Sequence, residues 1–224
     1  MQSGLPSLVK TSKTAHDGIA MSAAHHDPHP EATIRPYWTG PRLRLRAMRA
    51  DDADLWLAEE RDDHEAVHFL NYGTPLPKSR HDAVAFVERY AEFGSRDERI
   101  MWSIETHAGE LVGGINLHSM DLKNGTFQTG TRIHRGHRGR GYGLEAKVMV
   151  LRFAFFELRY QKYEVRCLAT NDAMVRHMAR LGATLEGRIR RHVYTQGTYV
   201  DELAYGLTRE EFEARLPELE RSPT

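Results

Sequence analysis

The sequence predicts an α+β fold, of mixed α/β character, in which helices flank one central sheet. Two observations support this class. A run of short strand-like segments precedes residue 134, and a long apolar segment, 144–156, follows it. Strand-like and helix-like segments then alternate, which is the pattern of a sheet covered by helices. With 224 residues, 40% of them hydrophobic, the chain can bury one core of this kind.

Each strand and helix has a local signal. Leu43 and Leu45 alternate with arginines, as in a strand with one buried face. An acidic helical segment is expected from residue 51 to about 69 and a second helix at 81–93. The remaining expected strands are 101–105, 111–117, 126–133, 163–169, 189–194 and 199–207, and a short helix at 172–181 ends at Gly182.

The segment 144–156 is apolar on two sides. One stripe of apolar residues repeats at the spacing of successive helical turns, and a second stripe lies beside it. A helix with two apolar sides is expected to be buried between layers of structure. The first stripe is Leu144, Val148, Leu151 and Phe155, and the second is Ala146, Met149 and Phe153.

The first 35 residues differ from the rest in composition. They are polar and show no sustained helical or strand period, so residues 1–35 are expected to form an N-terminal arm and residues 36–224 the folded domain. His25, His26 and His29 lie in this arm without cysteines or a second ligand cluster. We therefore expect no metal site there.

Charge and cysteine content exclude several classes of protein. Lys plus Arg and Asp plus Glu both number 31, so no overall positive field points to nucleic acid or to a membrane surface. No apolar run reaches the roughly 20 residues that a membrane span needs. Cys167 is the single cysteine, which excludes an internal disulfide and favours a reducing compartment. We expect a cytoplasmic protein with neither nucleic-acid nor membrane partners.

A glycine-rich basic turn stands between the expected strand 126–133 and the apolar helix. Its glycines allow positive φ angles and a close approach of ligand to backbone. The first turn of the helix has N–H groups without intrahelical acceptors and the positive end of the helix dipole, which together favour a pyrophosphate group. Arg135, Arg138 and Arg140 add positive charge. This turn is expected to bind a phosphate-bearing ligand.

The spacing of the glycines excludes two nucleotide-binding motifs. A Gly-x-Gly-x-x-Gly dinucleotide motif that starts at Gly139 would need glycine where Leu144 stands. The Gly-Lys-Ser/Thr end of an ATPase-type phosphate loop does not occur in the chain. Arg138, Gly141 and Gly143 instead fill the pattern Arg/Gln-x-x-Gly-x-Gly/Ala. In this the segment resembles the acetyl-CoA motif of the GNAT superfamily of N-acetyltransferases.

The resemblance extends from about residue 43 to 207. Residues 163–171 resemble the family's next strand, which ends at an asparagine, here Asn171, that faces the pantetheine arm of the coenzyme. Residues within 181–205 resemble the branch of the ribosomal-protein alanine N-acetyltransferases. The resemblance implies a mostly antiparallel sheet that splays where its fourth and fifth strands meet, and it allows a homodimer.

The same resemblance implies the ligands. Acetyl-CoA would be the co-substrate, without a metal, and backbone groups of Thr131 and Ile133 would bond its pantetheine amides like an added strand. The thioester would thereby be aimed at a primary amine, either a protein N-terminus or a small molecule, which attacks it directly. The backbone amides expected to hold the pyrophosphate are those of Arg138, Gly139, Arg140, Gly141 and Gly143.

Three positions depart from the family's proton-handling pattern. Met178 stands where many members have a tyrosine that protonates the leaving thiolate, and Met174 stands where the ribosomal branch has a serine. Gln128 stands where a glutamate is expected as a candidate base. Both methionines are also ordinary packing residues of a helix.

The proton acceptor and the amine site rest on weaker signals. His118, at the end of the expected strand 111–117, is the first candidate base, with a pKa near ~6.5 if it is unperturbed. Tyr72 and Glu105 are weaker candidates. Eight acidic residues between positions 51 and 65, Glu59 and Asp63 among them, form either a solvated helix face or an acidic wall that attracts a cationic amine. Glu59, Asp63 and Tyr72 are expected at the amine site.

Two competing functions remain beside the acetyltransferase. The missing acid, serine and glutamate fit a catalytically silent domain that binds acyl-CoA for sensing or regulation. A nucleic-acid binder that uses the arginines of the basic turn is disfavoured, because the turn lacks interleaved aromatic residues and the chain has no net positive charge.

Overall fold

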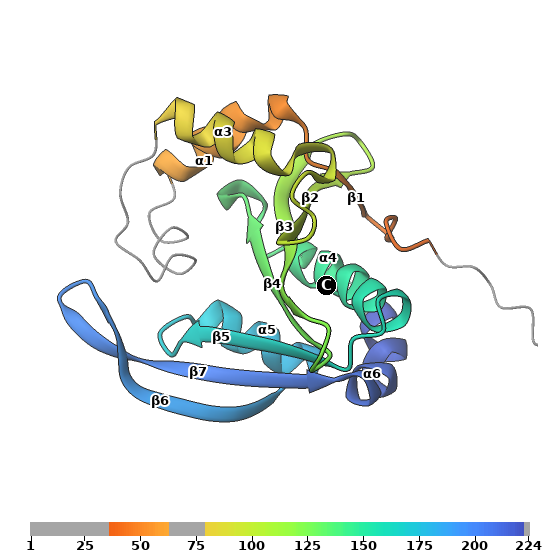
Figure 1. Cartoon of the computed structure of the whole chain (residues 1–224), viewed down its shortest axis with the longest axis vertical. Helices are drawn as coiled ribbons and strands as arrows, with labels where there is room; N and C mark the ends of the chain where they lie inside the picture. The colour runs from red at the N-terminus through yellow and green to blue at the C-terminus, as the bar shows by residue number, and fades with distance from the viewer. Residues whose placement is uncertain (1–35, 63–78, 222–224) are drawn as a thin grey trace, which may run out of the picture. The chain divides into compact units, whose positions relative to one another are not determined.

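One sheet is the framework of the fold. The computed structural model describes residues 36–62 and 79–221, which belong to one unit, Pro36–Thr224. Within them, seven strands pair in the order β1-β2-β3-β4-β5-β7-β6 (Figure 1). All neighbours are antiparallel except β4 and β5, which confirms the expected mostly antiparallel sheet. The strands are β1 (Leu43–Ala47), β2 (Arg99–Thr106), β3 (Leu111–Asp121), β4 (Thr126–Ile133), β5 (Lys162–Leu168), β6 (Thr184–Thr195) and β7 (Thr198–Thr208).

Helices cover both faces of this sheet. Met101 and Trp102 are neighbours on β2, so their side chains point to opposite faces. Met101 packs with residues of α1 and α3, whereas Trp102 belongs to a larger cluster with α4, α5 and α6. The fold is therefore a sheet between two helical layers. The helices are α1 (Ala53–Asp62), α3 (Arg80–Tyr90), α4 (Tyr142–Arg152), α5 (Asp172–Leu181) and α6 (Arg209–Arg221).

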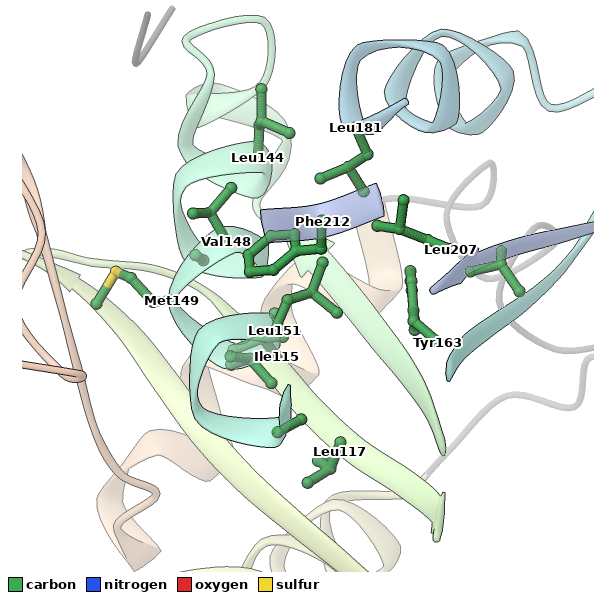
Figure 2. Close-up of a cluster of buried hydrophobic side chains, with 14 of the residues drawn as sticks. Ile115, Leu117, Leu144, Val148, Met149, Leu151, Tyr163, Leu181, Leu207 and Phe212 are labelled. Carbon is green, nitrogen blue, oxygen red and sulfur yellow. The ribbon is translucent and has the colours of Figure 1, made fainter. Parts of the chain in front are cut away.

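Helix α4 lies in the larger core, as its two apolar stripes predict. Residues 144–151 are all buried, and a π-helical turn, Phe153–Glu157, continues the helix. Phe155 in that turn packs on Phe127 of β4 and on Phe212 of α6, with ring centroids 5.3 and 5.2 Å apart. Figure 2 shows the ring of Phe212 facing the α4 side chains. The burial of α4 between the sheet and the C-terminal helix is thus confirmed.

Helix α6 was not expected from the sequence. Its segment carries few apolar residues, and Pro217 lies inside it, which weakens any local helix signal. Phe212 and Leu219 are its buried residues, seven positions apart on one face. The packing of Phe212 against Phe155 is a tertiary contact. It therefore could not be predicted from a periodic pattern within the segment.

The structure describes only part of the expected acidic N-terminal helix. A 3-10 turn, Ala50–Asp52, leads into α1, which is described as far as Asp62. The rest of the expected segment, from residue 63 to about 69, lies outside the described residues, as do Asp63 and Tyr72. None of the helices in the described part of the chain is long and apolar enough to cross a membrane.

Candidate functional site

Strands β4 and β5 form a fork. They pair in parallel at two positions, Thr126 with Lys162 and Phe127 with Tyr163. Beyond Phe127 and Tyr163 they diverge, and β5 continues with β7 as its partner (Figure 1). Within residues 36–62 and 79–221, one edge of β4 therefore has no neighbouring strand over the rest of its length.

The backbone of β4 presents alternate residues to this open edge. His134 N–H donates to the carbonyl oxygen of Val112 on β3 at 2.9 Å. In an antiparallel pair the direction of the backbone N–H and C=O groups alternates along the strand. The backbone N–H and C=O groups of Thr129, Thr131 and Ile133 therefore point away from β3, into the fork. This is the orientation that an extended ligand needs in order to pair with Thr131 and Ile133.

The glycine-rich turn lies at the open end of β4. Gly139 has φ 76° and Gly141, the residue before α4, has φ 79°, values that other residues rarely adopt. Gly143 lies in the first turn of α4, whose N–H groups lack intrahelical acceptors. The arginines Arg138 and Arg140 fold over the turn and donate to the carbonyl oxygens of residues 133 and 136, at 3.0 and 3.1 Å. A turn whose geometry and charge favour an anion thus lies beside the fork.

Glu145, which the sequence analysis did not single out, anchors this turn to the start of β1. Its carboxylate is buried and accepts from the backbone N–H groups of Arg42 and Leu43 at 2.9 and 3.1 Å. The Arg42 side chain also donates to Glu145 and, through Nη1, to the carbonyl oxygen of Arg140. A carboxylate inside an otherwise apolar helix was the signal that could have identified it.

Helix α5 forms the other side of the fork. Asn171 is its N-cap residue, and Asn171 Oδ1 accepts from Met174 N–H at 3.0 Å. Met178 is fully buried in the larger core, and Met174 packs against that core. The two methionines thus pack as helix residues, and neither has a group that exchanges protons.

His118 lies on β3 directly opposite Gln128 of β4 and Arg99 of β2. Burial, together with the positive charges of Arg99 and Lys147, lowers the pKa of His118 to about 4. The expectation of an unperturbed imidazole is wrong for this reason. His118 is neutral near pH 7, and it holds a proton only weakly.

Part of the acidic segment is engaged in ion pairs within the protein. Asp52 is buried and bonded by Arg46 at 2.8 and 2.9 Å, and Ser103 Oγ donates to it at 2.7 Å. Glu105, the weaker candidate base, is also buried and paired with Arg46 and Arg44. We call these five residues the arginine–carboxylate cluster. Two of its members had been assigned to the acceptor wall or to catalysis.

Elsewhere in the segment, Asp54 pairs with Arg80 on the surface at 2.8 Å. The acidic wall is therefore smaller than the sequence suggests. Of the residues expected at the amine site, Asp63 and Tyr72 lie outside the described part, and the Glu59 side chain is not among those described.

A second buried polar group lies where the fork closes. Lys147 of α4 is 0% exposed, and its Nζ donates to Tyr163 Oη at 2.9 Å. Tyr163 Oη is in turn 2.9 Å from Thr129 Oγ1. We call Lys147, Tyr163 and Thr129 the fork chain. The sequence analysis missed it, although a lysine inside the buried stripes of 144–156 was a usable signal.

Two more polar atoms in the fork are buried without a partner among the described residues, His177 Nε2 and Thr131 Oγ1. A Cβ placed on Gly143 would lie 3.8 Å from the His177 ring and 3.9 Å from Thr131, so the two side chains flank that glycine. Burial lowers the pKa of His177 to about 3, with smaller effects from Lys147 and Arg180. The fork therefore has polar atoms that no described residue satisfies.

The described part of the chain contains no cluster of side chains suited to hold a metal ion. No group of three or more His, Cys, Asp or Glu side chains converges there. Cys167 is buried, and burial raises its pKa to about 11, so its thiol is not a ready nucleophile.

The comparisons with known proteins agree with this geometry. The family model described as "Acetyltransferase (GNAT) domain" matches residues 42–184. An uncharacterized N-acetyltransferase of Bacillus subtilis, YokL, derived from the SPbeta prophage, is 35% identical over 182 residues, which cover 79% of this chain and 96% of that protein.

Solved structures share the fold at lower identity. A spermidine N-acetyltransferase from Vibrio cholerae, in complex with CoA and spermine, has a TM-score of 0.67 at 16% identity and covers 76% of this chain and 98% of that one. RimL, a ribosomal L7/L12 α-N-protein acetyltransferase in complex with CoA, has a TM-score of 0.67 at 17% identity, with 77% and 97% coverage. From the family match and the B. subtilis relative, the chain belongs to the GNAT family of N-acetyltransferases.

Proposed function

We propose that this protein transfers the acetyl group of acetyl-CoA to a primary amine, through direct attack of the amine on the thioester. The observation that carries the proposal is the fork. An open edge of β4 presents Thr131 and Ile133, and it leads to a turn whose Gly139 and Gly141 have positive φ at the N-terminus of α4. The CoA complexes of RimL and the V. cholerae enzyme, which share this fold, support the choice of ligand.

In this proposal the coenzyme lies along β4 as an added strand. The pantetheine amides pair with Thr131 and Ile133, and Asn171 faces them from the opposite side of the fork. The pyrophosphate sits on the turn, where the α4 dipole and the arginines of that turn favour an anion. Since Arg138 Nε already donates to the Ile133 carbonyl oxygen at 3.0 Å, this arginine would hold both the strand end and the ligand.

The acceptor is proposed to be cationic before it reacts. Acidic residues of the segment 51–65, Glu59 and Asp63 among them, would attract an ammonium group. A protein N-terminus and a polyamine-like small molecule both fit. Replacing Glu59 and Asp63 with lysine should raise KM for such an amine and weaken the salt dependence of KM. An unchanged KM would show that these residues form only a solvated surface.

His118 is proposed as the group that receives the amine proton, directly or through water. Since its pKa is held at about 4, it cannot give an inflection near pH 6.5 in the rate. The dependence of kcat/KM on pH above 6 should instead follow the ionisation of the amine itself. If His118→Ala has no effect on kcat at any pH, water is the acceptor and His118 is a structural residue.

Calorimetric titration with CoA tests the coenzyme site. Gly141→Asp should weaken binding by more than ~100-fold, about 2.7 kcal/mol, because it places a carboxylate where the phosphates sit. Gly197→Asp is the matched control. Gly197 also has φ 79°, but it lies in the turn between β6 and β7, so the backbone strain is the same and the site is untouched. Equal CoA affinity in the two variants would place the coenzyme elsewhere.

A panel of amines separates transfer from silent binding. The buried Met178, which stands where relatives carry a tyrosine, is the observation that favours a silent acyl-CoA-binding domain. Release of free thiol from acetyl-CoA, with mass analysis of the amine product, should identify the acceptor. Tight CoA binding without thiol release on any amine would favour the silent domain.

A further inference from the structure

Lys147 is a buried cation at the closed end of the fork. Its side chain is fully buried, and no carboxylate within the described residues lies at ion-pair distance from it. Its polar neighbour is Tyr163, whose ring centroid is 5.5 Å from Lys147 Nζ. A buried charge without a counter-ion is costly. Its presence here indicates that a ligand with negative charge completes the arrangement.

The charge of Lys147 fixes the direction of the hydrogen bonds in the fork chain. An ammonium group can only donate, so Tyr163 Oη accepts from Lys147. Because Tyr163 Oη already accepts from Lys147, the arrangement that uses its single hydroxyl hydrogen is the one in which Tyr163 donates to Thr129 Oγ1, at 2.9 Å. Thr129 accepts that bond, and its own hydroxyl hydrogen is available to a third group. The chain therefore ends in a donor on β4.

This donor lies where the coenzyme's sulfur would be, if the coenzyme binds as proposed above. Thr129 is two residues beyond Phe127, the last β4 residue paired with β5, and alternate residues of a strand are about 6.6–6.8 Å apart. Its side chain is on the same face as that of Thr131, the residue expected to pair with the last pantetheine amide. The thioester sulfur follows that amide by two methylene groups, in the direction of Thr129.

We propose that Thr129 donates a hydrogen bond to the coenzyme's sulfur and that Lys147, through Tyr163, stabilises this sulfur as a thiolate. The inference rests on the proposed function. The amine nitrogen forms a bond to the acetyl carbon, and the carbon–sulfur bond then breaks with the electron pair on sulfur. The products are the amide, the coenzyme A thiolate and the amine proton, which leaves through His118 or water. A tyrosine on α5 is not needed, because the leaving group departs as an anion.

The other charged and titratable groups around Lys147 do not replace it. His118 and Arg99 approach from β3 and β2, and His177 and Arg180 belong to α5. Both histidines have lowered pKa values, about 4 and about 3, and are neutral near pH 7. Arg99 and Arg180 lie on other elements and, among the described residues, make no hydrogen bond to the fork chain. Lys147 is the cation that is hydrogen-bonded into it.

The test measures the thiol pKa of CoA bound to the protein, which requires no knowledge of the acceptor amine. The ultraviolet absorbance of the thiolate is followed against pH, with desulfo-CoA complexes as the blank that removes the protein's own tyrosines. In the wild-type complex the thiol pKa should lie about one unit or more below that of free CoA. Lys147→Met should return it to the free value. Tyr163→Phe, which keeps the ring but removes the relay, and Thr129→Val should each give part of that rise.

Arg152→Met is the matched control, since it removes a cation from the same helix. Arg152 lies at the far end of α4, beside Glu220 at 3.8 Å and the Tyr37 ring at 5.4 Å. It should leave the thiol pKa unchanged. CoA that binds with the same thiol pKa in wild type and Lys147→Met would overturn this inference while leaving the proposed function intact. Failure of the wild-type protein to bind CoA would overturn both. If Lys147→Met does not fold, the result with Tyr163→Phe decides, because its ring packing is retained.

Discussion

Two buried polar clusters lie on opposite faces of the sheet and differ in how they are completed. In the arginine–carboxylate cluster, Arg46 bridges Asp52 and Glu105, and donors from Ser103 and Arg44 complete the set. Burial alone would raise the pKa of both carboxyl groups. The hydrogen bonds from Arg46 and its neighbours outweigh burial, so both pKa values are lowered. This cluster neutralises itself.

The fork chain is more completely buried, but within the described residues it has no carboxylate. Lys147 holds two hydroxyl groups in line, and the last of them, on Thr129, has a hydrogen still to donate. The first cluster fastens β1, β2 and the turn before α1, whereas the second leaves a donor at the open edge of β4. A buried network whose charges and polar groups are all paired indicates a structural role. A buried network that keeps an unused donor beside the fork indicates a place for a ligand.

The largest expected effect is on stability and falls on the closed cluster. Arg46→Met should lower the free energy of unfolding by about 3–5 kcal/mol, because it leaves buried carboxylates without their shared partner. Urea unfolding measures this. Arg89→Met is the control, since its pair with Glu98 has both side chains more than half exposed and is worth about 0–1 kcal/mol. A loss below about 1 kcal/mol in Arg46→Met would show that the cluster contributes little.

The pH dependence of the free energy of unfolding should also distinguish the two clusters. His118 and His177, next to the fork chain, have folded pKa values of about 4 and about 3 against an unfolded value near 6.5. Their contribution to stability is fully present above pH 6.5 and is lost as the pH falls from there through the folded values. The free energy of unfolding should therefore fall by about 1–3 kcal/mol between pH 7 and 5.

Two variants test whether the two histidines cause this fall in the free energy of unfolding between pH 7 and 5, which we call the acid limb. Lys147→Met should make it shallower, since the charge of Lys147 lowers both histidine pKa values. Arg89→Met should not change it, because its pair with Glu98 has both side chains more than half exposed and lies apart from the two histidines. Unfolding free energies that stay constant from pH 7 to 5 would contradict the burial of the two imidazoles.

Substitution of Met178 tests whether turnover depends on a proton donor from α5. Met178→Leu is close to volume-conserving, so it should cost less than about 1.5 kcal/mol of stability. Turnover should change by less than ~10-fold, since no proton passes through this side chain. Steady-state kinetics on an accepted amine give the answer. A loss beyond ~100-fold with the fold intact would mean that Met178 orients the thioester.

The smallest expected effect is the stability of Lys147→Met without coenzyme. The replacement removes an uncompensated charge and retains an unbranched chain of similar length, so the free energy of unfolding should stay within about 1 kcal/mol or rise. Thermal unfolding of the coenzyme-free protein measures it. A loss of several kcal/mol, as expected for Arg46→Met, would make the fork chain a structural network like the other cluster.

Much of the fold could be predicted from the sequence. The alternation in β1, the apolar stripes of α4 and the glycine stop after α5 are local signals, and the structure bears each of them out. Helix α6 is the exception. It is held by contacts of Phe212 with residues more than fifty positions away, and no pattern inside its own segment encodes them.

The candidate site divides in the same way. Composition and spacing alone determined the glycine turn at 138–143, because positive φ and an exposed helix N-terminus are properties of a short segment. Only the tertiary structure decided that β4 and β5 part after Phe127, that Asp52 turns inward to Arg46, and that Lys147 meets Tyr163 and Thr129. These depend on strand register and on side chains brought together from distant elements. Burial and charge at such meeting points set the pKa values, so the titration of His118 could not be predicted from its place in the sequence.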